Sequence, residues 1–227
     1  MSMSNMRHFF VLLLAAGAFG CGGLSYRVNR DQLKEITIEN KLLLFDAEND
    51  VSIALDEKEA IHREIQQLKQ DIQDVDLQIT EAEVDASRAA EKSDQAKEQV
   101  ALAAIEVFQL KIAYLEENLG FLREKLKAQD DLILVAEAKF ELAKAKLAKN
   151  NNVRGAADIE LPDFEAQVDK CVERAKETLQ DLGQYEQEVT AVKKQWLDRR
   201  DQLMAASGGG VGSPWAEDSA LWGHEEP

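Results

Sequence analysis

The sequence predicts an all-α protein built from long coiled-coil helices, and three observations support this fold class. Of its 227 residues, 31% are charged, only 6% are aromatic and three are proline, a composition typical of long helices rather than of a compact mixed fold. Between Ile61 and Val100, apolar and small residues recur in alternating steps of four and three, which keeps them on one side of a helix. No Gly or Pro occurs between Leu24 and Leu119, so nothing there obliges a helix to end.

Residues 1–20 have the features of a secretory signal sequence. Arg7 provides a positive start, residues 9–16 form a short apolar run, and the small residues Gly17 and Ala18 follow. The apolar run is shorter than the ~20 residues that a membrane-spanning helix needs. We therefore expect this segment to direct export and to be removed.

Cys21 stands where the signal sequence ends, directly after Ala18-Phe19-Gly20. This arrangement resembles the lipobox of bacterial lipoproteins, with Phe19 at a position where a small residue is usual. The resemblance implies that Cys21 becomes the lipid-bearing first residue of the mature protein, carrying acyl chains such as palmitate. Because Gly22 is not an Asp, it also implies an outer-membrane anchor facing the periplasm. Ordinary cleavage after Ala18, which leaves a soluble protein, is the alternative.

The body of the chain begins with an expected tether at residues 21–30, followed by helical periodicity. We expect one long coiled-coil helix over residues 31–149. Ser93-Asp94 is a cap signal inside that range, so an elongated three-helix bundle with a break near Ser93 is the alternative. A second apolar stripe runs beside the first from Ile105 to Leu126, and the widened face predicts contact with two helices at this level.

The second half of the chain contains a connector, a return helix and a tail. Asn150-Asn151-Asn152 should end the long helix, because Asn tolerates the left-handed conformation that closes one. Residues 150–161 then form the connector, and Pro162 suits the first turn of a return helix over 162–206. Residues 207–227 are a Gly-rich, then acidic tail without periodicity, which predicts disorder.

Equal lengths suggest how the return helix pairs. Its residues 162–204 are as many as residues 105–147, so we expect these two stretches to form an antiparallel coiled-coil hairpin. Residues whose numbers sum to about 309 then lie side by side, placing Trp196 opposite Ala113 and Leu126 opposite Gly183. This pairing leaves the seam at Ile61–Val100 without a partner inside the chain. We therefore expect self-association or a partner helix along that seam.

Few residues suggest chemistry, and we expect no enzyme activity, no cofactor, no metal and no small-molecule substrate. His62 has no Cys or acidic partner at ligand spacing and is interpreted as an exposed helix residue. Cys171 occupies a seam position, either as a small core residue or as a disulfide partner of the same residue in another chain. Trp215 and Trp222 in the tail are candidate anchors for a groove on a partner, or tail residues without a role.

The net charge of −16 argues against nucleic acid and against anionic lipid surfaces as partners, because both would repel the chain. The sequence therefore predicts a lipid-anchored periplasmic coiled-coil protein of the cell envelope that acts as a spacer or assembly platform. A periplasmic holdase-type chaperone and a coiled-coil adaptor of an envelope export complex are the alternatives. The acidic surface disfavours the first, and the lack of strand-rich segments disfavours the second.

Overall fold

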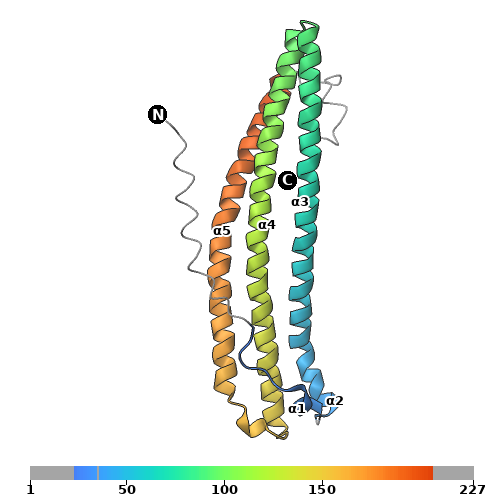
Figure 1. Cartoon of the computed structure of the whole chain (residues 1–227). Helices are drawn as coiled ribbons and strands as arrows, with labels where there is room; N and C mark the ends of the chain where they lie inside the picture. The colour runs from blue at the N-terminus through green and yellow to red at the C-terminus, as the bar shows by residue number, and fades with distance from the viewer. Residues whose placement is uncertain (1–22, 35, 207–227) are drawn as a thin grey trace. The chain divides into compact units, whose positions relative to one another are not determined.

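The computed structural model describes residues 23–34 and 36–206, and throughout these residues the protein is all-α (Figure 1). Its elements are, in chain order, α1 (Arg30–Lys34), α2 (Ile38–Lys41), η1 (Leu42–Leu44), α3 (Phe45–Glu91), α4 (Gln95–Asn150), η2 (Ala156–Asp158) and α5 (Leu161–Ala206). The predicted fold class is confirmed, and so is a return helix with nearly the predicted bounds. The signal sequence, Cys21, Trp215 and Trp222 lie outside the described residues.

A tight turn separates α3 from α4. Ser93 has a positive φ of 56°, and the N–H of Asp94 donates to the carbonyl of Ala89 at 2.9 Å, as in a Schellman motif. The side chain of Asp94 then accepts the N–H of Lys97 at 3.2 Å and caps the start of α4. The helix expected over residues 31–149 is therefore interrupted here, and the alternative with a break near Ser93 describes this region.

A second turn of the same kind ends α4. Asn152 has a φ of 47°, and the N–H of Val153 donates to the carbonyl of Ala148 at 3.2 Å. This is the closure that the run of asparagines predicts. After η2, helix α5 begins at Leu161 with Pro162 in its first turn, also as predicted.

Contacts divide the chain into two compact units, each with its own apolar core. Among the described residues, unit 1 combines the chain from residue 23 to Val51 with Ile133–Val172, and unit 2 combines Ser52–Leu132 with the chain from Glu173 to Ala206. The buried residues of the unit 1 core come from the N-terminal segment, the end of α4, the connector and the start of α5: Val28, Ile36, Leu44, Ala145, Leu147, Ala148, Val153, Ala156, Ile159 and Phe164.

In unit 2, α3 and α4 form an antiparallel hairpin, and α5 packs against it (Figure 1). The seam of α3 is buried there against the other two helices in one cluster: Ile61, Ile65, Leu68, Val75 and Ala82 with Val107, Phe108, Leu115 and Leu122 of α4 and Trp196 and Leu203 of α5. The expectation that the seam lacks an internal partner is therefore wrong. The widened apolar face of α4 does contact two helices, as predicted.

The pairing of α4 with α5 follows the predicted register. The hydroxyl of Thr178 donates to Asp131 Oδ2 at 2.7 Å, and these two residue numbers sum to 309. Trp196 stacks on Tyr114, next to the expected Ala113, with ring centroids 5.5 Å apart and planes 7° from parallel. At Gly183, however, an added Cβ would meet nothing within 4 Å, so close packing does not require a glycine there.

The turn end of the α3–α4 hairpin is rich in alanine. In Figure 1, α5 ends at Ala206 before it reaches this turn, so among the described helices the turn end consists of α3 and α4. Ala86 and Ala89 of α3 and Ala101 and Ala104 of α4 are all buried. Small side chains allow two helices to approach closely, which accounts for the change of the seam from Leu and Ile to Ala.

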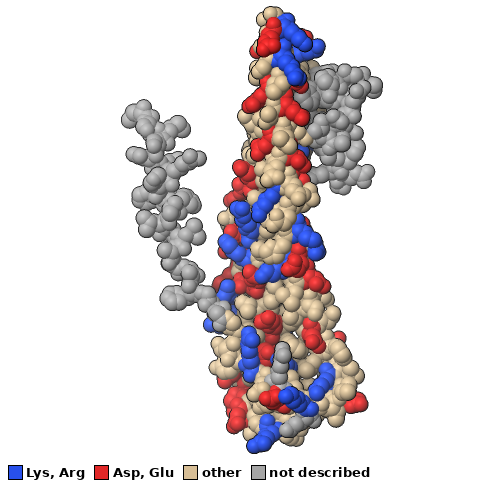
Figure 2. All heavy atoms as spheres, turned by 45° about the vertical axis from the view of Figure 1, so that its right-hand side comes forward, with Lys and Arg blue, Asp and Glu red and all other residues tan. Residues whose placement is uncertain are grey.

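The surface of the described chain is mixed in charge. On the face shown in Figure 2, acidic and basic side chains are interspersed with uncharged ones. No helix in the described part of the chain is long and apolar enough to cross a membrane.

Candidate functional site: the N-terminal strap

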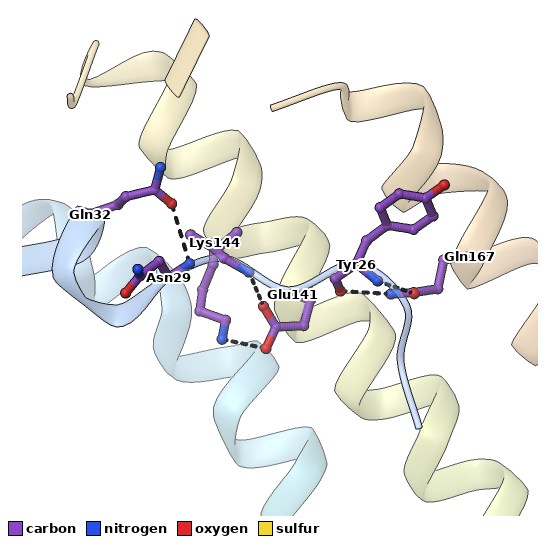
Figure 3. Close-up of polar contacts among 7 residues, drawn as sticks. Tyr26, Asn29, Gln32, Glu141, Lys144 and Gln167 are labelled. Atoms are coloured by element: carbon purple, nitrogen blue, oxygen red, sulfur yellow. Dashed lines mark hydrogen bonds and ion pairs between the residues drawn. The ribbon is translucent and has the colours of Figure 1, made fainter. Parts of the chain in front are cut away.

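Residues 24–34 lie against α4 and α5 in unit 1, and we call this segment the strap (Figure 3). Residues 21–30 were expected to be a flexible tether, but the part that the structure describes is docked. Val28 is only 5% exposed and belongs to the core of unit 1. Burial of this apolar side chain favours packing of the strap over its exposure to solvent.

The first attachment of the strap is a paired hydrogen bond at Tyr26. Its N–H donates to Gln167 Oε1 at 2.9 Å, and Gln167 Nε2 donates back to the Tyr26 carbonyl at 3.1 Å. The side-chain amide of Gln167, in α5, thus forms hydrogen bonds with both the N–H and the carbonyl of Tyr26. The Tyr26 ring also lies beside Phe164, with centroids 5.7 Å apart.

The second attachment is a buried ion pair on α4. The Val28 N–H donates to Glu141 Oε2 at 2.9 Å, while Glu141 Oε1 accepts from Lys144 Nζ at 2.5 Å. Both charged residues are only 8% exposed, and Lys144 Nζ lies 4.7 Å from the centre of the Phe140 ring. A buried carboxylate needs such partners to offset its desolvation. Glu141 therefore joins the strap to α4.

The strap ends in a capped helical turn. Asn29 Oδ1 accepts the N–H of Asp31 at 3.0 Å, and the Asn29 N–H donates to Gln32 Oε1 at 3.2 Å. This reciprocal arrangement is close to a capping box and starts α1. The spacing of Asn29 and Gln32 is a sequence signal for this turn that the sequence analysis missed.

The other singled-out residues within the described chain belong to different units. His62 is half-buried in α3, in unit 2, and Cys171 is half-buried in α5, in unit 1. No group of three or more His, Cys, Asp or Glu residues within the described ranges is arranged to hold a metal ion.

A shallow groove of about 360 Å³ lies among the three helices of unit 2. Apolar side chains supply part of its lining, including Ile61, Leu132, Leu179 and Leu182. Glu57 and Glu64 add negative charge, and Lys125 pairs with Glu64 at 3.8 Å. The lining of this groove is thus partly apolar and partly acidic.

Arg199 of α5 lies between Trp196 and Leu203 at the same spacing of three and four residues, so it shares their apolar face. In unit 2 it has a partner. Its Nη2 donates to Glu106 Oε2 of α4 at 2.5 Å. This hydrogen bond lowers the pKa of Glu106 below its ordinary value and raises the pKa of Arg199. The pair ties α5 to α4, which accounts for a charge at an otherwise apolar position.

Comparison of the chain with protein-family models, curated proteins and solved structures found no match. The function is therefore inferred from the residues and their geometry. The feature that stands out is the strap, which lies close to Cys21 in the sequence and is hydrogen-bonded to α4 and α5.

Proposed function

We propose that the protein is a lipid-anchored coiled-coil scaffold of a bacterial cell envelope. Cys21 carries the lipid, and the helices face the periplasm as a spacer or assembly platform, with the outer membrane as the anchoring membrane. The lipobox-like sequence around Cys21 supports the anchor. The docked strap is the observation that carries the scaffold role.

The strap supports this role because of where it lies in the chain. Cys21 precedes Tyr26 by only five residues, and Tyr26 and Val28 are hydrogen-bonded to α5 and α4. An anchor at Cys21 is thereby connected to two long helices through a short link. A slack linker of 20 residues or more would instead leave the position of the helices undefined.

Assembly with a second copy or a partner helix is part of the proposal. Since α4 and α5 fill the seam of α3, a partner would contact the outer side of α3. Leu77 and Val84 are 63% and 43% exposed there, and their spacing of seven residues places them on one face. Sedimentation of the Leu77→Asp, Val84→Asp double variant tests this surface. If the double variant formed assemblies of the same mass as the wild-type chain, the outer side of α3 would not be the contact surface.

The test of the anchor compares the wild-type chain with Cys21→Ser, expressed with and without globomycin. We expect acyl chains on the wild-type protein by mass spectrometry and its recovery in the outer-membrane fraction. The Cys21→Ser protein should lack the acyl chains. Cys171→Ser is the matched control and should keep both properties. A wild-type protein that is soluble and unlipidated would refute the anchor.

The tail is tested separately, by capture of partners from envelope extracts. We expect that deletion of residues 207–227, or the Trp215→Ala, Trp222→Ala double variant, reduces capture of a specific partner. Equal capture by all three forms would show that the tail tryptophans do not serve as anchors.

A holdase-type chaperone is the second candidate, and the groove in unit 2 favours it. Leu179 is 44% exposed at this groove, which would allow contact with apolar segments of an unfolded client. Suppression of client aggregation by the wild-type chain, lost in Leu179→Asp but not in Leu77→Asp, would support this candidate. No suppression by the wild-type chain would exclude it.

A further inference from the structure

Three large apolar side chains of unit 1 point away from its core. Ile38 of α2, Leu42 of η1 and Phe45 at the start of α3 are 75%, 53% and 59% exposed. Their spacing of four and three residues places them on one face of this nearly continuous helical segment. We call this face the apolar stripe.

The fold of unit 1 does not require these side chains. Ile36 and Leu44, at 4% and 9% exposure, hold the same segment in the core of unit 1. Solvated polar residues at the positions of the stripe would serve the core equally well. Exposed apolar side chains that share a face indicate contact with something outside the chain.

We infer that the apolar stripe inserts into the lipid–water interface of the membrane that holds Cys21. This inference rests on the proposed lipid anchor. It adds a second contact with the bilayer, made by the folded chain itself, and it assigns the end of unit 1 near the α4–α5 connector to the membrane surface.

The strap and the apolar stripe are attached at different positions along α4. The strap is attached at Glu141 through Val28, whereas Asn40, next to the stripe, donates to Asn151 Oδ1 at 2.7 Å. Glu141 and Asn151 are ten residues apart, which corresponds to about 15 Å along a helix. The stripe therefore lies about 15 Å nearer to the connector than the docked strap does.

The link to the lipid is long enough to bridge this difference. Tyr26 follows Cys21 by five positions, and an extended chain of this length reaches about 17 Å. The acyl chains and the apolar stripe can thus enter one membrane surface together. A link much shorter than this would have placed them at different depths.

The charges near the stripe favour apolar insertion over electrostatic adsorption. Lys34 and Lys41 are matched by Asp31 and Glu39, and the whole chain is strongly acidic. Neutral phospholipids are therefore the expected partner, because an anionic surface would repel the chain. Insertion of an amphipathic helical face by about 5–10 Å would cover side chains at these positions.

The experiment measures the membrane depth of single positions in the lipidated chain. With Cys21 acylated and Cys171→Ser introduced, a nitroxide label reacts only at an added cysteine, either Phe45→Cys or the matched control Leu102→Cys. Leu102 of α4 is similarly exposed, at 52%, but lies in unit 2. In phosphatidylcholine vesicles we expect accessibility to a water-soluble nickel complex to be at least about threefold lower at position 45 than at position 102.

A second measurement uses charged variants of the lipidated chain. Phe45→Asp should speed transfer of the protein between phosphatidylcholine vesicles about tenfold. The free energy lost when a Phe side chain is no longer buried corresponds to a change in affinity of about this size. Leu102→Asp should leave the transfer rate unchanged. Circular dichroism of both variants checks that the helices remain folded.

The outcomes separate this inference from the anchor on which it rests. Acylated Cys21 with equal nickel accessibility at positions 45 and 102 would overturn the insertion of the apolar stripe and leave the anchor intact. Protection of position 45 without vesicles, together with spin–spin broadening, would assign the stripe to a second copy and overturn its insertion. An unacylated chain whose position 45 is still protected by vesicles would overturn the anchor alone, and an unacylated chain without protection would overturn both.

Discussion

The buried pair of Glu141 and Lys144 leads to a quantitative prediction for the stability of unit 1. Glu141→Gln keeps an oxygen for the Val28 N–H but removes the carboxylate that pairs with Lys144 at 2.5 Å. The two side chains are only 11% and 10% exposed, so solvent screens their interaction little. Removal of one member of a buried pair costs about 3–5 kcal/mol. We expect Glu141→Gln to lower the free energy of unfolding by about 3 kcal/mol.

An exposed pair in the same unit provides the matched control. Lys146 and Glu165 are 3.5 Å apart, with side chains 51% and 54% exposed. Glu165→Gln should therefore cost no more than about 1 kcal/mol. The double variant Glu141→Leu, Lys144→Met should recover part of the loss, because an apolar pair can replace a buried ion pair at little cost. Recovery should be incomplete, since the Val28 N–H would lose its acceptor, which costs about 1–3 kcal/mol.

Urea unfolding followed by circular dichroism measures these differences, and hydrogen exchange of the Val28 amide tests whether the strap is released. Glu141→Gln should raise the exchange rate at Val28 more than Glu165→Gln does. If the two substitutions had equal effects on stability and on exchange, Glu141 could not be the buried attachment point described above. Glu141 would then not hold the strap on α4, whatever the state of Cys21.

Three further predictions concern the turns, a helix interior and acid stability. Ser93→Gly should raise the free energy of unfolding by about 1 kcal/mol, because Gly adopts the positive φ without strain, and an unchanged urea midpoint would contradict this. Gly183→Ala should stabilise by about 1 kcal/mol, since a Cβ there has open space, whereas Gly155→Ala should destabilise at its φ of 82°; thermal unfolding distinguishes the two. Since the hydrogen bond from Arg199 lowers the pKa of Glu106, its stabilisation is present above the unfolded-state pKa of about 4.3 and is lost as the pH falls through the lower folded-state pKa. Glu106→Gln should therefore flatten the loss of stability below about pH 4.3, and an unchanged slope would refute this.

Much of the fold is predictable because helical periodicity and length carry the information. Equal lengths on either side of the connector predict a register for α4 and α5 that the hydrogen bond from Thr178 to Asp131 confirms. The Asn run at 150–152 predicts the end of α4, because Asn is one of the few residues that adopt a positive φ readily. Both signals are local or depend only on counting residues.

The break at Ser93 shows where such signals are weak. Serine has little preference for the left-handed conformation, so the sequence offers only the capping residue Asp94 as evidence of a turn. In the structure, hydrogen bonds from Ser93 and Asp94 to the last carbonyls of α3 complete the turn. The contacts of α3 with α4 hold Ser93 in a conformation that its own preference would not select.

The docking of the strap was not predictable from local pattern. Tyr26 and Val28 stand among polar residues without periodicity, which is typical of a linker. Their partners, Gln167 and Glu141, lie more than 100 residues away. Such contacts depend on the tertiary arrangement alone, and a sequence without aligned relatives carries no trace of them.

The seam of α3 is the case in which two sequence observations conflicted. The equal lengths assign a single neighbouring helix, the return helix, to residues 105–147. The two apolar stripes of that stretch, however, require two neighbouring helices. Val107 and Phe108, one from each stripe, are 0% and 2% exposed, which a single neighbouring helix could not achieve, because adjacent residues point about 100° apart around a helix. A second helix had to come from within the chain or from another chain. A turn at Ser93 lets the chain itself supply that helix and buries the seam on α4, so the surface available to a partner is the outer side of the hairpin.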